Sequence, residues 1–388
     1  MKILHISPNA SYTEGWSYQE NLLPKYQVKK GHDVTLIVSN YSRPNKELIK
    51  VECDDKISSD GFRVIRKEKK YKSTSNIISL FNHIELYDLL KEIQPDFIHF
   101  HGLGDATLLQ VAKYKKKEKP SLCLVVDNHL DYNIGFDPEK NIWTKILRLY
   151  YRVFQKLINK YVDAVYGVTP WRAEYAMDVY GIPRQKISVL IMGADDEKLR
   201  FNKKQEIRRQ VREQYGIENS DFLIVTGGKI DKDKNIHILM KACMQLPQAK
   251  LLIFGNVLDD VKNEFYDILN HSKNIIYIGW IDSDKVYDFF FASDLVCFPG
   301  QHSVLWEQAC ASKIPCLFKR WIGMNQVDNG GNSEFLDEIT EKGIKNKLLG
   351  LINTDKYREM KKIAESEKTD IYLYSNIAEK SLERMKNV

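Results

Sequence analysis

The sequence predicts an α/β protein made of two doubly wound domains, each a parallel β-sheet crossed by helices. Short apolar runs that fit strands alternate with helical patterns along the whole chain, and this order is typical of βαβ units. The 388 residues exceed one ordinary domain and suit two, each able to bury its own core. A charged segment from Met192 to Phe201 follows the last strand of the first half. We therefore expect a domain at 1–195 and a second at 196–370.

Eleven apolar runs are the predicted strands. In the first half they are Ile3–Ile6, Val34–Val38, Phe62–Ile65, Phe97–Phe100, Leu122–Val126 and Ala164–Val168. In the second half they are Phe222–Thr226, Lys250–Phe254, Ile275–Ile278, Leu295–Phe298 and Pro315–Phe318. The first helix of the second domain is expected at Glu206–Tyr215.

Composition indicates a cytoplasmic globular protein. Hydrophobic residues make up 43% of the chain, and no segment approaches the roughly 18 apolar residues of a spanning helix. Met1 and Lys2 lead directly into the first strand, so we expect no signal peptide. The six cysteines contain no CxxC pair and most have apolar neighbours, which favours reduced thiols in the core.

Positive charge is concentrated in the first half. Residues 1–200 contain 31 Lys and Arg against 25 Asp and Glu, and the remaining 188 contain 27 of each, so the whole net charge of +6 belongs to the first half. Two clusters, Arg66–Lys72 and Lys113–Lys119, and a basic aromatic helix at Asn141–Asp163 contribute most visibly. An anionic membrane surface is one interpretation of these features. The alternatives are solubilising lysines and a core helix with a solvated basic face. No nucleic-acid motif is present, so nucleic acid is not an expected partner.

The segment Leu295–Ala309 predicts an anion-binding junction between a strand and a helix. Its first four residues are apolar without alternation, as in a strand covered on both faces, and a Pro-Gly turn follows. Ser303 is the expected N-cap of the helix, and the amides near Ser303 and Val304 would face the carboxyl end of the sheet, where phosphate binds. Glu307 is placed to accept hydrogen bonds from sugar hydroxyls. The alternative is a surface helix whose glutamate is merely solvated.

The segment Thr226–Asn235 adds positive charge at a second strand end. A strand ends in two glycines, and Lys229 and Lys234 follow on the predicted loop. Two cations at the mouth of a sheet are suited to neutralise a diphosphate, and glycine allows a ligand to approach the backbone closely. Lysines on loops are often only solubilising, as Lys232 is expected to be.

Along nearly its whole length the chain resembles the retaining glycosyltransferases of family 4, which have the GT-B fold. The donor loop of that family commonly reads Gly-Arg-Leu, three residues, then Lys-Gly, and here Gly228-Lys229-Ile230 and Lys234-Asn235 occupy those places. The start MKILHISPN, a helix beginning near Gly15, and the segments Val168–Phe201 and Asn274–Gly300 are similar to family segments in the same order. The resemblance implies two Rossmann-like domains facing across a cleft, the first binding acceptor and the second binding donor. It also implies that a C-terminal helix at 371–388, about Ile371–Met385, crosses back to the first domain.

One position departs from the family pattern. The family pairs two glutamates eight positions apart, the first contacting the donor sugar and the second the ribose. Glu307 matches the second, but Pro299 stands where the first is expected. His302 or Gln301 would then take over the contact with the sugar, or the site is degenerate.

The resemblance also assigns the remaining site residues. Lys229 and Lys234 neutralise the diphosphate, Gly228 and Gly15 approach it, and backbone around Gly279 and Trp280 borders the base. His129 matches the active-site histidine that hydrogen-bonds the donor sugar. On the acceptor side we expect Trp16, which otherwise anchors the next helix, and His101.

His99 and His101 alternate along one strand and therefore share a face. No third ligand with metal spacing is evident, so no zinc site is expected.

The resemblance therefore implies sugar transfer with retention, from a nucleotide-diphosphate sugar such as a UDP-sugar, without a metal or other cofactor. The expected acceptor is a saccharide or lipid-linked saccharide in the synthesis of a cell-surface polysaccharide, a capsule or lipopolysaccharide, at the inner face of the cell membrane. The alternative is a catalytically weak scaffold subunit that binds nucleotide sugar.

Overall fold

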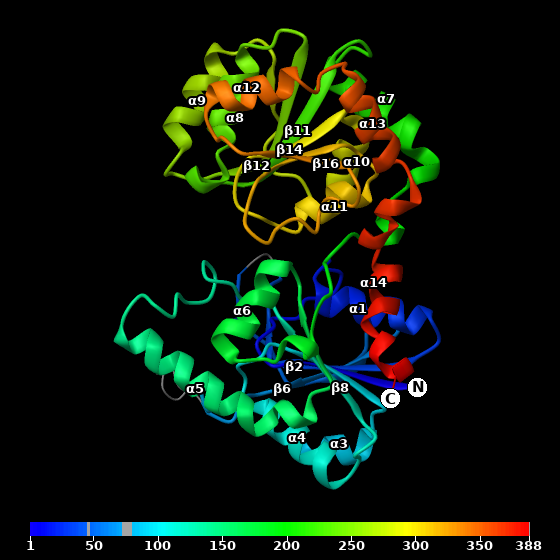
Figure 1. Cartoon of the computed structure of the whole chain (residues 1–388). Coiled ribbons are helices and arrows are strands. Elements are labelled where there is room, and N and C mark those ends of the chain that lie inside the picture. The colour runs from blue at the N-terminus through cyan, green and yellow to red at the C-terminus, as the bar shows by residue number, and fades with distance from the viewer. Residues whose placement is uncertain (45–46, 72–79, 388) are drawn as a thin grey trace. The chain divides into compact units, whose positions relative to one another are not determined.

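The computed structural model describes residues 1–44, 47–71 and 80–387 and divides into two compact units (Figure 1). Unit 1 comprises Met1–Ile191 and Tyr374–Val388, and unit 2 comprises Met192–Leu373. The chain therefore passes into unit 2 four residues before the expected boundary at 195, and it returns to unit 1 three residues after the expected one at 370.

The sheet of unit 1 has eight strands in the order β10-β9-β8-β7-β1-β2-β6-β5. All neighbours are parallel except β5, which runs antiparallel to β6 at the edge. The strands are β1 Lys2–Ser7, β2 Asp33–Ser39, β5 Asp55–Ile57, β6 Arg63–Lys67, β7 Phe97–His101, β8 Cys123–Asn128, β9 Ala164–Gly167 and β10 Ile187–Val189. A separate antiparallel pair consists of β3 Tyr41–Ser42 and β4 Ile49–Lys50.

The helices of unit 1 bury apolar side chains against this sheet. They are α1 Gln19–Lys29, α3 Tyr87–Ile93, α4 Thr107–Lys117, α5 Ile142–Ile158, α6 Pro170–Tyr180 and α14 Tyr374–Ser381. One core joins the strands to α3, α4, α5 and α6 through side chains such as Leu90, Val111, Phe154 and Val179. Strands β7 and β8 are fully buried for this reason, and they also bury the polar residues His99, His101, Asp127 and Asn128.

Two helices of unit 1 differ from the prediction. The first begins at Gln19 rather than near Gly15, because Gly15 lies in a turn with a φ of 79°. The C-terminal helix is shorter than Ile371–Met385, since α14 covers only Tyr374–Ser381 between two 3-10 segments. This helix belongs to unit 1 and packs on α1, where the ring of Tyr374 stacks on that of Tyr26 at 6.5 Å.

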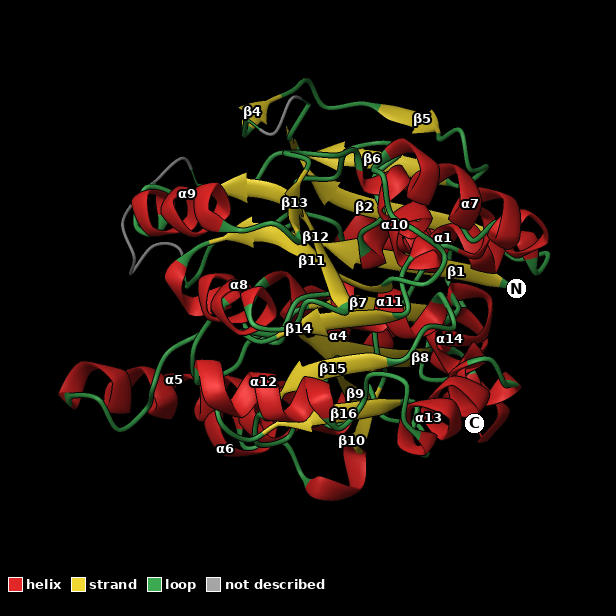
Figure 2. Cartoon of the chain, turned by 90° about the horizontal axis from the view of Figure 1, so that it is seen from above, coloured by secondary structure: helices red, strands yellow, loops and turns green. Residues whose placement is uncertain are grey.

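The sheet of unit 2 is wholly parallel, in the order β13-β12-β11-β14-β15-β16. Its strands are β11 Phe222–Ile230, β12 Ala249–Val257, β13 Ile275–Tyr277, β14 Leu295–Phe298, β15 Cys316–Lys319 and β16 Ser333–Leu336. Its helices are α7 Lys204–Gln214, α8 Ile236–Met244, α9 Lys262–His271, α10 Val286–Ala292, α11 Leu305–Ala311, α12 Glu341–Leu349 and α13 Asp355–Ala364. Figure 2 shows the parallel arrows of both sheets with helices along them.

The strand order places a topological switch point in each sheet. In unit 1, β1 lies between β2 and β7, and in unit 2, β11 lies between β12 and β14. At a switch point, the connections that leave two neighbouring strands run in opposite directions, and a crevice opens beyond the carboxyl ends of these two strands. The two strands are β1 and β7 in unit 1, and β11 and β14 in unit 2. The fold therefore indicates ligand positions after β1 and β7 in unit 1 and after β11 and β14 in unit 2.

The predictions about membrane-spanning helices and cysteines concern the whole chain. None of the helices in the described part of the chain has the length and apolar content needed to cross a membrane. All six cysteines lie in described residues, none is in a disulfide, and all but Cys53 are buried.

Candidate functional site

The loops that follow β11 and β14 enclose a cavity of about 190 Å³ in unit 2, at the switch point. Gly227, Gly228 and Lys229 line it from β11, and Lys234 lines it from the following turn. The other lining residues come mainly from the loop after β14, and they include Pro299, Gly300, Gln301 and Ser303. The two segments singled out in the sequence therefore meet at one cavity.

Two glycines allow this meeting of loops. A Cβ on Gly300 would come within 2.3 Å of the Cα of Lys234, so only glycine fits between the loops there. Gly228 has a φ of 107°, a conformation that other residues rarely adopt. Asn235, where the resembling loops have glycine, has a φ of 54°, which asparagine tolerates, and its amide donates to Pro299 O at 3.0 Å.

Lys229 and Lys234 differ in environment. Lys229 was expected on a loop, but β11 continues to Ile230 in parallel pairing with β12, so this lysine is on the strand end. Its side chain is 64% exposed and its Nζ lies 3.0 Å from Asp231 Oδ2. Lys234 donates from Nζ to Gln301 O at 2.7 Å, and burial lowers its pKa from the usual lysine value. Both cations border the cavity.

The helix after β14 starts later than the sequence indicates. α11 begins at Leu305 with Val304 as its N-cap, and no side-chain cap is formed, so the prediction of Ser303 as N-cap is wrong. Ser303 instead accepts from the amide of Trp306 at 3.0 Å through its carbonyl. Within the described residues, the amides of Ser303 and Val304 donate to no protein group. Ser303 lines the cavity and Val304 does not, so the amide of Ser303 is the one available to an anion there.

Glu307 is fully buried, so the alternative of a solvated surface glutamate is wrong. His302 Nε2 lies 2.8 Å from Oε1 of Glu307, and Gln326 donates to the same oxygen at 2.9 Å. The ring of His302 lies edge-on to Trp306, and its Nδ1 is buried with no protein partner in the described chain. The carboxylate therefore fixes His302, and its role toward a ribose stays a prediction.

Gly279 and Trp280 follow β13 on the far side of β12 from the switch point. Gly279 accepts the amide of Gly255 at 2.7 Å and has a φ of 73°. The Trp280 side chain is 56% exposed. Neither residue lines the cavity of about 190 Å³, so their position beside a base stays a prediction.

In unit 1, a cavity of about 460 Å³ lies at the switch point between β1 and β7. Ser7 and Asn9 border it after β1, and the segment from His101 to Asp105 borders it after β7. Glu20 of α1 and His129, which follows β8, also line it. The structure thus brings His101 and His129 together at one cavity, but Gly15 and Trp16 do not line it. Trp16 is half-buried, and its ring lies edge-on to that of Tyr18, just before α1 begins. This position agrees with the alternative interpretation of Trp16, in which it anchors the helix.

Beneath this cavity, Asp127 is the centre of a buried histidine cluster. Its Oδ2 lies 3.0 Å from His99 Nε2, 2.6 Å from His101 Nδ1 and 3.4 Å from His129 Nε2. Burial raises the pKa of Asp127, but the coulombic effect of His101 and His129 outweighs it and holds the pKa well below its usual range. The carboxylate is therefore charged and orients the imidazoles.

Asp127 also corrects the expectation that His99 and His101 have no third potential ligand. Ligand atoms of these three residues lie within 4.8 Å of one another. The sequence could not show this, because Asp127 comes from a neighbouring strand in register with His101. In the structure the same atoms are joined by hydrogen bonds, and the network extends from His101 to His5 Nδ1 at 3.1 Å and on to Gln27.

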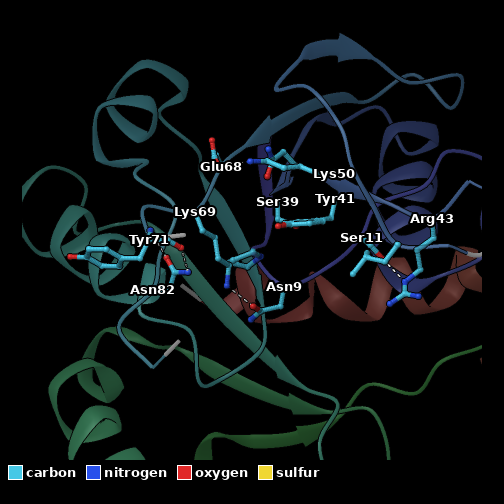
Figure 3. Close-up of a pocket in the computed structure, with 13 residues that line it drawn as sticks. Asn9, Ser11, Ser39, Tyr41, Arg43, Lys50, Glu68, Lys69, Tyr71 and Asn82 are labelled. Atoms are coloured by element: carbon cyan, nitrogen blue, oxygen red, sulfur yellow. Dashed lines mark hydrogen bonds and ion pairs between the residues drawn. The ribbon is translucent and has the colours of Figure 1, made fainter. Parts of the chain in front are cut away.

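A second cavity of unit 1, of about 590 Å³, shares Asn9, Lys69 and Asn82 with the first (Figure 3). Lys69 donates to Asn9 Oδ1 at 2.6 Å and to Asp105 at 3.0 Å, and Arg43 donates to Ser11 at 3.1 Å. The exposed rings of Tyr41 and Tyr71 line the same cavity. Amides, hydroxyls and aromatic faces of this kind suit a saccharide. This cavity could not be predicted from the sequence, because its residues come from strand ends, two short strands and loops that carry no recognisable motif.

Two family descriptions match the chain. "Glycosyltransferase Family 4" matches residues 23–198, and "Glycosyl transferases group 1" matches residues 207–367. The first match lies almost wholly within unit 1 and the second lies within unit 2.

Curated relatives match over part of their length. Alpha-galactosylglucosyldiacylglycerol synthase of Streptococcus pneumoniae is 23% identical over 175 residues, which are 42% of this chain and 46% of that protein. Lipopolysaccharide 1,2-N-acetylglucosaminetransferase of Salmonella typhimurium is 28% identical over 235 residues, which are 53% of this chain and 58% of that protein. The chain spans about half the length of the curated relatives it matches.

Solved structures match over the whole chain. A glycosyltransferase from Rickettsia africae superposes with a TM-score of 0.70 at 15% identity, covering 100% of this chain and 98% of that one. Anabaena Alr3699/HepE in complex with UDP superposes with a TM-score of 0.66 at 15% identity, covering 100% of both chains. These likenesses establish the fold.

Proposed function

We propose that this chain, which belongs to glycosyltransferase family 4 and has the GT-B fold, transfers a sugar from a nucleotide-diphosphate sugar to a saccharide or lipid-linked saccharide. The transfer retains the configuration at the anomeric carbon. The product belongs to a cell-surface polysaccharide or glycolipid. The activities of the two curated relatives, a glycolipid synthase and a lipopolysaccharide transferase, support this acceptor class.

The observation that carries the proposal is the cavity at the β11–β14 switch point. Lys229, Lys234 and Ser303 line one small cavity, and the amide of Ser303 donates to no protein group among the described residues. Cleavage of a glycosidic bond to a diphosphate increases the negative charge on the leaving phosphate. Groups that neutralise this charge act most strongly in the transition state, and they therefore accelerate the reaction rather than merely binding the donor.

The proposed reaction needs no side chain as nucleophile. The leaving phosphate takes the proton of the acceptor hydroxyl on the same face of the sugar, and the bond to the acceptor forms as the bond to phosphate breaks. Lysines supply the positive charge, so the proposal requires no metal. His129, held by the charged Asp127, is the unit 1 side chain proposed to hydrogen-bond the donor sugar.

The acceptor is proposed to bind in the two neighbouring cavities of unit 1, which share Asn9, Lys69 and Asn82. Tyr41 and Tyr71 offer aromatic faces to a sugar ring, and Asn9 and Asn82 offer amides to its hydroxyls. Figure 3 shows these four side chains among the residues that line the larger cavity. Arg43 has no carboxylate partner among the described residues, so the site also tolerates an acceptor with a negative group.

A catalytically weak nucleotide-sugar-binding scaffold is the second candidate. Pro299 stands where the resembling enzymes have a glutamate, and the carboxylate of Glu307 is already engaged by His302 and Gln326. Both observations reduce the number of groups that are free to hold the donor sugar.

One experiment separates the two candidates. The protein is incubated with a panel of UDP-, GDP- and ADP-sugars, beginning with UDP because a structural neighbour holds UDP, and donor consumption is followed with and without membrane-extracted glycolipid acceptors. Turnover that depends on acceptor, with a product whose anomeric configuration equals that of the donor by NMR, is the expected result. Nucleotide binding by calorimetry without turnover on any donor would favour the scaffold.

A further inference from the structure

Helix α5 exposes an apolar face to solvent. Ile142, Ile146, Leu149, Val153 and Leu157 recur every three or four residues and therefore lie on one side of the helix. All five are exposed, with Leu149 at 62% and Leu157 at 60%, and the neighbouring Trp143 reaches 75%. The opposite side, with Phe154 and Ile158, is buried in the core. The alternative of a core helix with a solvated basic face is therefore confirmed in part: the inner side is core and basic residues are exposed, but an exposed apolar stripe lies beside them.

We propose that this outer face of α5 is the surface by which the protein docks on an anionic lipid membrane. The proposal deepens the proposed function, because it assigns the place where a lipid-linked acceptor is met, and it rests on that function for its biological purpose. Its physical basis is independent of catalysis.

Charge complementarity identifies the occupant as an anionic surface. Residues 140–162 contain no Asp or Glu, and they contain six basic residues, which are Lys140, Lys145, Arg148, Arg152, Lys156 and Lys160. Lys145 and Arg148 pair with Glu139, and Arg148 and Arg152 pair with Asp178, whereas Lys140, Lys156 and Lys160 have no carboxylate partner among the described residues. Lys145 and Lys156 are exposed, and by helical spacing they flank the apolar stripe on one side. Apolar side chains inserted at the headgroup boundary with lysines beside them are the arrangement that binds anionic interfaces.

The alternative occupant, a second copy of the chain, fits less well. Two such faces in contact would bring the basic residues of both copies together without acidic partners on the helix. A helix of 17 residues extends about 25 Å, at about 1.5 Å per residue, so α5 is long enough to lie along an interface. Both views place α5 at the outer margin of unit 1 (Figures 1 and 2).

The lysine clusters noted in the sequence are less suited to this role. Lys115 pairs with Asp163, Lys119 with Asp96, and Lys70 with Glu85. Lys69 and Arg66 are directed to Asp105 and Asp54 within the fold. Ion pairs neutralise part of the charge of these clusters, as they do on α5, so the feature that distinguishes α5 is its exposed apolar stripe.

The test is flotation of the full-length protein with vesicles of phosphatidylcholine containing phosphatidylglycerol. Wild type is expected to float with anionic vesicles at low salt, to float much less with pure phosphatidylcholine, and to be released by added salt. The triple variant Trp143→Ser, Ile146→Ser, Leu149→Ser is expected to lose at least about tenfold in partitioning, since each removes apolar area from the interface.

Matched controls separate the helix from general effects. Ile57→Ser and Ile322→Ser replace exposed apolar residues elsewhere and should leave flotation unchanged. Lys145→Glu with Lys156→Glu is expected to abolish the preference for anionic vesicles, whereas Lys273→Glu with Lys342→Glu changes the net charge equally and should not. Circular dichroism and nucleotide binding by calorimetry verify that each variant is folded.

Absence of flotation by the folded wild type, or equal flotation of the triple variant, would overturn the proposal. So would a concentration-dependent dimer in sedimentation velocity that the triple variant abolishes, because a second copy would then be the occupant. These outcomes are independent of sugar transfer. A protein that floats but does not turn over any donor would refute the proposed function and leave the docking surface standing.

Discussion

Lys234 places a largely buried positive charge at the cavity proposed to bind the diphosphate, and Lys229 adds an exposed charge beside it. A charge-assisted contact of a lysine with a phosphate contributes about 1.5–3 kcal/mol. We therefore predict that Lys229→Ala and Lys234→Ala each reduce kcat/KM by at least about tenfold. Steady-state kinetics measure the change, with Lys232→Ala as a control of the same type. Two folded variants with wild-type kinetics would remove the phosphate role of this cavity.

Glu307 is predicted to support nucleotide binding, either by contacting the ribose or by holding His302. Glu307→Gln keeps the size of the side chain and removes its charge, so it is expected to weaken the binding of free nucleotide diphosphate by about tenfold, as expected for loss of a hydrogen bond to a charged group. Calorimetry without sugar or acceptor measures this effect. If the variant keeps wild-type affinity and thermal stability, Glu307 serves neither purpose.

In the cavities of both units, the types of the site residues could be predicted from the sequence, but the side chains that they contact could not. Lysines and glycines after a strand indicate a phosphate site, because that chemistry depends on local order. Asp127, His5 and Gln326 act through contacts between segments that are distant in the sequence. A single sequence does not show which residues of neighbouring strands lie side by side, so these contacts could not be predicted. Ser303 was misassigned as N-cap, since the N-cap is Val304 and the helix begins one residue later than predicted.

At the scale of elements, the eleven predicted strands all occur, because buried parallel strands are continuous apolar runs. Among the described residues, β3, β4, β5, β10 and β16 were not predicted. These strands are two to four residues long, and β4 and β5 are exposed, so no apolar pattern marks them. The strand β11 was predicted to end at Thr226, but it continues to Ile230. Gly227, Gly228 and Lys229 pair with β12 but are not apolar, so no apolar pattern marks them as strand.

The contact of α14 with α1 leads to a stability prediction. Tyr374 is almost fully buried and stacks on Tyr26, while Gln27 donates to Ser381 at 3.1 Å. Truncating a buried aromatic side chain costs about 3–5 kcal/mol, so Tyr374→Ala should lower the free energy of unfolding of unit 1 by about 3 kcal/mol. Urea unfolding measures it, with the exposed Lys380→Ala as control. A change below about 1 kcal/mol would show that α14 contributes little to unit 1.

Strands β1, β7 and β8 bring together the titratable side chains of His5, His99, His101 and Asp127. Burial, with His101 and His99 nearby, holds the pKa of His5 well below its usual value, burial also lowers that of His99, and Asp127 raises that of His101 against the effect of burial. A histidine with a lowered folded pKa stays neutral while the unfolded chain binds a proton below about pH 6.5. Its contribution to stability is therefore present above that pH and lost as pH falls.

We accordingly predict that His5→Gln loses less stability than wild type between pH 7 and pH 5. The difference in slope is at most about 1.4 kcal/mol per pH unit for one proton. Urea unfolding at several pH values measures it, and His271→Gln, at an exposed site, should leave the slope unchanged. Equal slopes for His5→Gln and wild type would mean that His5 does not titrate as its burial implies.

At the scale of the whole molecule, the proposed chemistry uses lysines and amides instead of a metal ion. Treatment with EDTA, followed by removal of the chelator, is therefore expected to leave the transfer rate unchanged. The assay is repeated with added magnesium or manganese. Strict dependence on either ion would contradict the lysine-based mechanism and would direct attention to the carboxylates beside the cavity, Asp231 and Asp233.

The return of α14 to unit 1 also determines when that unit can be completed during synthesis. Unit 2 is an insertion within unit 1, so the ribosome makes Met192–Leu373 before it makes the helix that covers α1. The surface around Tyr26 therefore stays open to water, and to chaperones, throughout the translation of unit 2. A nascent chain stalled before Tyr374 should be more sensitive to protease in unit 1 than the released protein, although every strand of that sheet has already emerged.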